Sequence, residues 1–259
     1  MDADTTYDLL VIGSGPAGQR AAIQGAKLGK RVAVVERKAV VGGVCINTGT
    51  IPSKTLREAV LYLTGYRERG MYGASYTVKQ NITIADLLFR ANHVMTHEVE
   101  VVRSQLMRNR IDVLSAEATF LDPHSIRLHY LVGGGYRDVT ADKVIIAVGT
   151  NATQDPHIPF DGQHIFISDD ILRLDHLPRT LSIIGAGIIG LEYASLFAAL
   201  GVKVTLVDKR DRLLPFIDAE IMDTLAYHLR ENLVMLRLGE EVRSIEPLDD
   251  AHNGRGRIN

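Results

Sequence analysis

Two glycine-rich segments have the residue types and spacing that bind the diphosphate of a dinucleotide. VIGSGPAG carries Gly13, Gly15 and Gly18, and SIIGAGIIGLE carries Gly185, Gly187 and Gly190. In such a turn the first glycine permits a tight bend and the second lets the backbone approach the diphosphate. The third lets the helix pack closely on the strand. The free N–H groups and the positive end of the helix dipole then face the diphosphate.

An acidic residue follows each glycine pattern at the same distance. Glu36 ends RVAVVE and Asp208 ends KVTLVD, each eighteen residues after the third glycine. A carboxylate at this position accepts hydrogen bonds from ribose hydroxyls. Asp208 favours NAD, while the cations that follow it can hold the 2′-phosphate of NADP or form a solvated basic turn; these are Lys209, Arg210 and Arg212. Two complete patterns indicate two bound dinucleotides, as in a flavoenzyme supplied by a nicotinamide.

The segment GGVCINTGTIPSK, residues 42–54, holds the only cysteine of the chain. Cys45 is followed five residues later by Thr50, and Lys54 ends the segment. The order of motifs, with AVGT at 147–150 and GAGIIGLE at 185–192, resembles the flavin-dependent pyridine nucleotide–disulfide oxidoreductases. Active disulfide reductases of that family have a second cysteine where this chain has Thr50, so the resemblance excludes the thiol–disulfide reaction.

Within the family, the Cys-to-Thr pattern and NTGTIPSKTLREAV resemble the soluble, Si-specific pyridine nucleotide transhydrogenases. The resemblance covers all 259 residues, a little over half of a family member. It implies FAD as cofactor and hydride transfer between NADPH and NAD+ through one nicotinamide site, hence ping-pong kinetics. It also implies a cytoplasmic homo-oligomer with nicotinamide dinucleotides as its partners.

The resemblance also implies a set of site residues. Lys54 lies by the flavin, paired with Glu192, and is expected to be buried with it; Cys45 and Thr50 complete the expected catalytic set. The expected FAD ligands also include Gly13, Gly15, Pro16, Ala17, Gly18, Glu36, Arg37, Gly42, Gly43, Val44, Ala118 and Gly149. The expected nicotinamide dinucleotide ligands are Gly185, Gly187, Ile188, Ile189, Gly190, Asp208 and Val242.

Several residues have plainer interpretations. Cys45 is also typical of a small packed side chain, and Lys54 of a surface lysine near a helix start. A flavin NAD(P)H oxidase or peroxidase is a second hypothesis, in which Cys45 forms a sulfenic acid; replacing Cys45 by Ser separates the two activities. His93 and His97 lie four residues apart without a third ligand, so no metal site is predicted.

Composition is typical of an ordinary soluble globular protein. The 259 residues carry 29 basic and 31 acidic side chains, a net charge of −2 that does not favour nucleic acid. One cysteine rules out an intrachain disulfide and fits a reducing compartment. The acidic start lacks the positive region of a signal peptide. The apolar stretch Ile183–Val202 has the length of a membrane span, but Glu192 and the glycine pattern favour a strand–turn–helix.

Strand and helix patterns alternate along the chain, which predicts two Rossmann-like βαβ units with parallel sheets. The predicted strands are residues 7–12, 31–36, 111–120, 125–132, 137–150, 181–184 and 203–208. The predicted helices are residues 15–29, 55–69, 85–110, one between 184 and 203, and about 220–232. In the third helix Val94, Val99, Val101, Val102 and Leu106 recur at helical spacing.

The stretch 151–162 interrupts the pattern with two prolines and predicts a domain boundary. We expect an FAD-binding domain over residues 1–153 and an NAD(P)-binding domain over residues 154–259. The last sixteen residues predict a hairpin with a turn at Asn253–Gly254. A domain ending there leaves an unpaired strand edge, so we expect an N-terminal piece of a longer protein. An inactive nucleotide-binding fragment is the third hypothesis.

Overall fold

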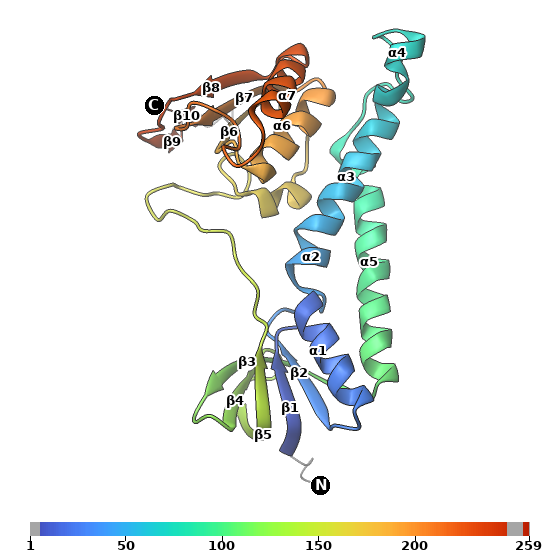
Figure 1. Cartoon of the computed structure of the whole chain (residues 1–259), viewed down its shortest axis with the longest axis vertical. Coiled ribbons are helices and arrows are strands. Elements are labelled where there is room, and N and C mark those ends of the chain that lie inside the picture. The colour runs from blue at the N-terminus through green and yellow to red at the C-terminus, as the bar shows by residue number, and fades with distance from the viewer. Residues whose placement is uncertain (1–5, 248–255, 259) are drawn as a thin grey trace. The chain divides into compact units, whose positions relative to one another are not determined.

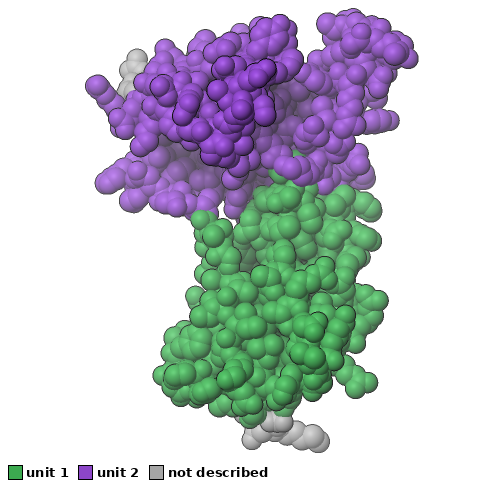
Figure 2. Space-filling model, in the orientation of Figure 1, with its two compact units in different colours: residues 1–53, 91–151 green, residues 54–90, 152–259 purple. Residues whose placement is uncertain are grey.

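The computed structural model describes residues 6–247 and 256–258, which fall into two compact units. Unit 1 takes residues 1–53 and 91–151, and unit 2 takes residues 54–90 and 152–259 (Figure 2). Each unit is therefore assembled from two separate stretches of chain. The predicted division into an FAD-binding domain up to residue 153 and an NAD(P)-binding domain from residue 154 refers to the bound nucleotides. It therefore stays a prediction.

Five strands of unit 1 close into a ring (Figure 1). They are β1 (Thr6–Ile12), β2 (Val32–Glu36), β3 (Asp112–Phe120), β4 (Ser125–Tyr130) and β5 (Tyr136–Ile146). β1 is parallel to β2 and β5, and β2 is parallel to β3, whereas β4 runs antiparallel to β3 and β5. The ring closes because β5 is long: residues 136–140 pair with β4, and residues 140–146 pair with β1.

Helices cover this ring through the apolar faces that the sequence predicts. α1 (Pro16–Lys27) packs on β1 and β2 (Figure 1), and α2 (Gly43–Asn47) follows β2 in the chain. In the part of α5 (Ile84–Arg108) that belongs to unit 1, the buried residues from Val99 on recur at a spacing of three or four. Its buried side chains join one core cluster with Val11, Ala22 and Val34; they are Val99, Val102 and Leu106.

Unit 2 contains a three-stranded parallel sheet in the order β6–β7–β8. Its strands are β6 (Thr180–Ile184), β7 (Lys203–Asp208) and β8 (Met235–Leu238), joined by the crossover helices α6 (Ile188–Ala199) and α7 (Ala219–Glu231). Together with β1–α1–β2 of unit 1, this arrangement confirms the predicted α/β fold with two βαβ units. The suspected membrane span is β6, the glycine turn and α6. Among the described residues, no helix is both long and apolar enough to cross a membrane.

The predicted hairpin near the end of the chain is confirmed in its strands. β9 (Ile245–Pro247) and β10 (Gly256–Ile258) pair in antiparallel fashion. The predicted turn at Asn253–Gly254 lies outside the described residues.

The core of unit 2 draws on helices that lie far upstream in the sequence. α3 (Thr50–Leu63) and the start of α5 contribute buried side chains to the same cluster as α6. From α3 and α5 these are Leu56, Ala59, Val60, Ile84 and Leu87. α6 is apolar on nearly all sides, and six of its twelve residues are buried, whereas Ile188 and Ile189 at its start are exposed.

One predicted helix differs from the structure. The helix expected over residues 55–69 begins at Thr50 and ends at Leu63, since Gly65 adopts a left-handed φ of 61°. Two short turns follow, η1 (Tyr66–Glu68) and α4 (Arg69–Tyr72). The remaining element is η2 (Ser168–Arg173), a single short 3₁₀ segment too brief to show a periodic pattern.

Candidate functional site

The first glycine turn packs as closely as the sequence predicts. A Cβ on Gly18 would lie 1.9 Å from the carbonyl oxygen of Gly13, so only glycine lets α1 approach the turn. Gly15 is the N-cap of α1, and Pro16 and Ala17 begin the helix. Since a glycine N-cap has no side chain to accept from the first-turn N–H groups, these donors remain for an anion.

Glu36 ends β2 and is held firmly beside this turn. Its carboxylate accepts from the amide of Ser14 at 3.0 Å, the hydroxyl of Ser14 at 2.5 Å and the amide of Lys38 at 2.9 Å. Only 8% of Glu36 is exposed, whereas the neighbouring Arg37 points to solvent. The acid is thus fixed in place before any ligand arrives.

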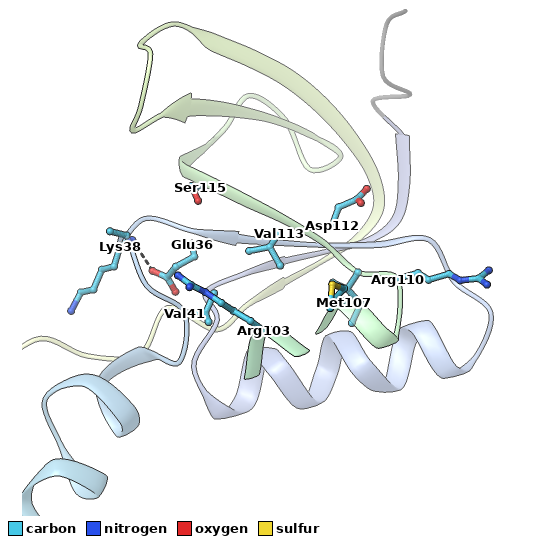
Figure 3. A pocket seen from close by; sticks show the side chains of 11 residues that line it. Glu36, Lys38, Val41, Arg103, Met107, Arg110, Asp112, Val113 and Ser115 are labelled. Atoms are coloured by element: carbon cyan, nitrogen blue, oxygen red, sulfur yellow. Dashed lines mark hydrogen bonds between the residues drawn. The ribbon is translucent and has the colours of Figure 1, made fainter. Parts of the chain in front are cut away.

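A pocket of about 550 Å³ opens beside Glu36 (Figure 3). Its lining combines β2, the following loop, β3 and the end of α5, and includes Lys38, Val41, Arg103, Met107 and Ser115. Apolar and charged side chains share this lining, so both the base and the ribose hydroxyls of a nucleoside would find suitable groups there. Sequence reasoning missed the contribution of α5, because nothing in the sequence links Arg103 or Met107 to a strand end more than sixty residues upstream.

The segment that holds Cys45 contacts the first glycine turn. Gly43 lies so near Gly15 that a Cβ on Gly43 would come within 2.8 Å of the Gly15 Cα. The amide of Gly42 donates to the hydroxyl and the carbonyl oxygen of Ser14. Unit 1 therefore brings together Gly13–Gly18 and the residues expected to line the flavin, Gly42, Gly43, Val44 and Cys45.

Cys45 and Thr50 lie on different helices. Cys45 is a free, partly buried thiol on α2, and Thr50 is the exposed first residue of α3. Between them the Thr48 hydroxyl oxygen is buried without a hydrogen-bond partner among the described residues. A buried hydroxyl without a hydrogen-bond partner lowers the stability of a folded protein. Its presence in this segment is therefore consistent with a polar ligand close by.

The predicted pairing of Lys54 with Glu192 is confirmed. Nζ donates to Oε1 at 2.5 Å, and both residues belong to unit 2. The expected burial of the pair is wrong for the lysine: its side chain is 58% exposed, and that of Glu192 is 17% exposed. Lys54 follows the first turn of α3, whose buried face is formed by other residues, so its long side chain reaches Glu192 along the surface.

The second glycine turn repeats the geometry of the first. A Cβ on Gly190 would lie 2.0 Å from the Gly185 carbonyl oxygen, and Gly187 is the N-cap of α6. Ile188 and Ile189 begin α6 with exposed side chains. A large hollow of about 2090 Å³ borders this turn and is also lined by Arg210.

Asp208 ends β7 with its carboxylate almost fully covered. It accepts from the amide of Ala186 and from both the amide and the guanidinium of Arg210. The hydrogen bond from the Arg210 side chain holds the pKa of Asp208 well below its usual range. The sequence placed cations after Asp208 but did not show which of them contacts it.

Of the expected ligands among the described residues, Glu36 lines the first hollow, and Gly185, Gly187, Ile188, Ile189 and Gly190 line the second. Three of the others are also far in sequence from both glycine turns. Ala118 sits half-buried on β3 opposite Leu128, and Gly149 is exposed after β5 with a φ of 67°. Val242 is half-buried before β9. In the part of the chain that the structure describes, none of the three lines either hollow.

No metal centre is evident within the described residues, where no group of three or more potential ligands converges. His93 and His97 are exposed on α5, as predicted for a solvated helix face.

Comparison with known proteins identifies the family to which this chain belongs. Residues 7–258 match the model of the pyridine nucleotide-disulphide oxidoreductases. The soluble pyridine nucleotide transhydrogenase of Mycobacterium tuberculosis (strain ATCC 25177 / H37Ra) is 55% identical over 240 residues, 93% of this chain and 51% of that protein. The protein of the same name in Colwellia psychrerythraea is 40% identical, over 97% of this chain and 53% of its own length.

Solved structures agree with this result. The HOCl-induced flavoprotein disulfide reductase RclA from Escherichia coli is 31% identical with a TM-score of 0.80, covering 98% of this chain and 53% of that one. The chain spans about half the length of the relatives that it matches.

Proposed function

Because the chain belongs to the pyridine nucleotide-disulphide oxidoreductase family, we propose that it forms part of an FAD-dependent transhydrogenase. Such an enzyme transfers a hydride between NADPH and NAD+. The observation that carries the proposal is two complete glycine-turn-and-acid sites in a chain with a single thiol. The named transhydrogenase relatives support it.

The residues of unit 1 fit FAD. The N-terminus of α1 offers free N–H groups to a diphosphate, and Glu36 has a fixed carboxylate for a ribose. Because Gly43 has no side chain, its backbone packs directly against Gly15 of the glycine turn. FAD, when bound, supplies a two-electron carrier that accepts a hydride and returns it.

The chain's own residues would position the reactants. Lys54, which Glu192 holds by an ion pair, would supply a positive charge that can stabilise negative charge on FAD. The turn at Gly185–Gly190 and the N-terminus of α6 would hold the nicotinamide dinucleotide. Val242, Ala118 and Gly149 stay predicted ligands without a direct structural argument.

The single cysteine limits which group can accept the hydride from the reduced flavin. Thr50 stands where a second thiol would be needed, so no disulfide within the chain can take the electrons. On the transhydrogenase proposal, which the named relatives support, a second nicotinamide dinucleotide would be the acceptor. Since the described residues of unit 2 offer one glycine turn of this kind, donor and acceptor would occupy it in succession.

Steady-state kinetics of the full-length protein that contains this chain test the proposal. Donor and acceptor concentrations are varied together, and the double-reciprocal plots are expected to be parallel, with flavin absorbance in the purified protein. Intersecting lines would show that both nucleotides bind at once and would refute alternation at one site. A colourless protein without measurable FAD binding would refute the flavoenzyme itself.

A further inference from the structure

The buried hydroxyl of Ser14 connects two separate parts of unit 1. Its Oγ donates to the Glu36 carboxylate at 2.5 Å and accepts from the amide of Gly42 at 3.0 Å. Because an ionised carboxylate only accepts hydrogen bonds, the hydroxyl proton lies toward Glu36, and a lone pair of Oγ remains for Gly42. One hydroxyl thus joins the end of β2 to the start of α2.

The groups of this connection are shielded from water. Ser14 is 0% exposed and Glu36 is 8% exposed, and Gly42 is buried as well. The backbone of Ser14 is also held, since its carbonyl oxygen accepts from Nε2 of the buried Gln19 at 2.7 Å and from the Gly42 amide at 3.2 Å. A hydrogen bond to a charged acceptor is strong, and a buried group that loses its partner has no water to replace it. Ser14 is therefore fixed, and the groups that it bonds are fixed with it.

The second glycine turn of the chain does not have this hydroxyl. Ala186 occupies the position of Ser14, and its amide donates to Asp208 as the amide of Ser14 donates to Glu36. The backbone hydrogen bond is thus common to both turns, whereas the hydroxyl is present in the first turn alone. Asp208 instead accepts from the side chain of Arg210. A glycine turn of this kind therefore forms without the hydroxyl, and the role of the hydroxyl lies in something particular to unit 1.

The segment that carries Cys45 is particular to unit 1. Gly42 is the N-cap of α2, and Cys45 lies on this helix of five residues. A helix so short has little stability of its own, so contacts from outside determine where it lies. The described contacts at its start are the hydrogen bonds from Gly42 to Ser14 and the packing of Gly43 on Gly15. The position of Cys45 therefore depends on Ser14.

We propose that Ser14 is a positioning residue that fixes two parts of the FAD site in one arrangement. These parts are Glu36, expected at the ribose, and the segment with Cys45, expected at the flavin. The inference rests on the proposed function, because it requires FAD in unit 1. Ser14 needs no contact with FAD for this role, since it acts through Glu36 and Gly42. A site that is fixed before the ligand arrives loses less conformational freedom on binding, so the hydroxyl strengthens FAD binding and restrains Cys45.

The test follows both parts of the site in the full-length protein that contains this chain. Flavin fluorescence measures the affinity for FAD. Alkylation of Cys45 by iodoacetamide at saturating FAD, quantified by peptide mass spectrometry, measures how often the segment opens. We expect Ser14→Ala to weaken FAD binding about 10-fold and to raise the alkylation rate about 3- to 10-fold, the range for one lost hydrogen bond.

A double-mutant cycle tests the connection itself. Glu36→Gln alters the acceptor of the Ser14 hydroxyl, and we expect it to raise the alkylation rate of Cys45 while Ser14 is present. In the Ser14→Ala background the same change is expected to raise the rate no further, because the connection is already broken. The matched control is Thr64→Val in unit 2, which removes a buried hydroxyl that donates to the Val60 carbonyl oxygen at 2.7 Å. It is expected to change neither FAD affinity nor the Cys45 rate.

The outcomes separate this inference from the function on which it rests. A wild-type protein that binds no FAD would overturn both. A wild-type protein that binds FAD, with a Ser14→Ala variant whose FAD affinity or Cys45 rate is unchanged, would overturn only the role of Ser14. Additive effects in the cycle, or an equal rise of the Cys45 rate in Thr64→Val, would do the same, because they would indicate a general loss of stability. If Ser14→Ala does not fold, Glu36→Gln decides alone: a raised Cys45 rate would support the connection, and an unchanged rate would overturn it.

Discussion

Lys54 and Glu192 are 138 residues apart in sequence, yet the Nζ of one contacts the Oε1 of the other within unit 2. For a fully buried pair, removing one partner costs about 3–5 kcal/mol because a charge is left unpaired. Here the lysine is 58% exposed, so the relevant range is that of exposed pairs, about 0–1 kcal/mol. The pair therefore contributes little to folding, and its value lies in placing a charge.

We therefore expect Lys54→Met to leave thermal unfolding nearly unchanged while slowing flavin reduction by NADPH in the full-length protein. The methionine keeps an unbranched side chain that is one atom shorter, but it removes the cation that would stabilise developing negative charge. Stopped-flow absorbance measures the rate, and calorimetry measures the unfolding midpoint. Glu192→Gln is the matched control, since it also breaks the ion pair but leaves the Lys54 charge. Equal rates in Lys54→Met and wild type would contradict the role of the lysine.

At the scale of single residues, the sequence was most informative where a backbone requirement leaves only one residue type. The close approach of Gly18 to Gly13, and of Gly190 to Gly185, follows from the glycine spacing alone. The Lys54–Glu192 pair followed from the family resemblance and could not be read from spacing. The two hydrogen bonds from the Arg210 guanidinium to the Asp208 carboxylate could not be predicted from the sequence. Three cations follow that strand, and only side-chain geometry distinguishes them.

At the scale of elements, α5 begins with a reciprocal cap. The hydroxyl of Thr83 accepts from the amide of Asp86 at 3.3 Å, and the Asp86 carboxylate accepts from the amide and the hydroxyl of Thr83. Lys79 donates to the same carboxylate at 2.6 Å. The hydrogen bond from Lys79, followed by those from Thr83, lowers the pKa of Asp86 to about 2.

This cap predicts a pH dependence with a definite sign. Because the folded pKa lies below the unfolded value, the stabilisation is fully present above the ordinary pKa of 3.8 and is lost as the pH falls toward about 2. Asp86→Asn is expected to unfold at a lower temperature than wild type at pH 7, and the difference is expected to vanish near pH 2. Calorimetry at several pH values measures it. A difference that grows as the pH falls would contradict the assignment.

Element types were predictable from periodicity, whereas element ends and short segments were not. The long β3, the buried β2 and the apolar face of α5 agree with their patterns. The helix after Lys54 ended early, because Gly65 has a left-handed conformation that its spacing does not reveal. The short β8 was missed: four residues alternating in burial give too little pattern to separate a strand from a loop.

At the scale of the whole molecule, one helix serves two cores. Leu87 near the start of α5 belongs to the buried cluster of unit 2, together with α3 and α6. Leu106 near its end belongs to a cluster of unit 1, together with Val11 and Val34. Both side chains are almost completely buried, at 1% and 0% exposure. The sequence showed a single apolar helix and could not show that its two ends pack in different units.

This arrangement predicts that two equivalent substitutions in α5 act on different parts of the molecule. Leu87→Ala and Leu106→Ala each remove a buried side chain and leave a cavity, at a cost of about 2–5 kcal/mol. Because the two cavities lie in different clusters, we expect Leu87→Ala to lower hydrogen-exchange protection in α6 and β7 while β1 and β2 keep theirs. Leu106→Ala is expected to do the reverse, and each variant is the control for the other. If both variants lowered protection equally in both units, the two units would unfold as one cooperative body. That result would contradict the prediction that the two buried clusters open independently.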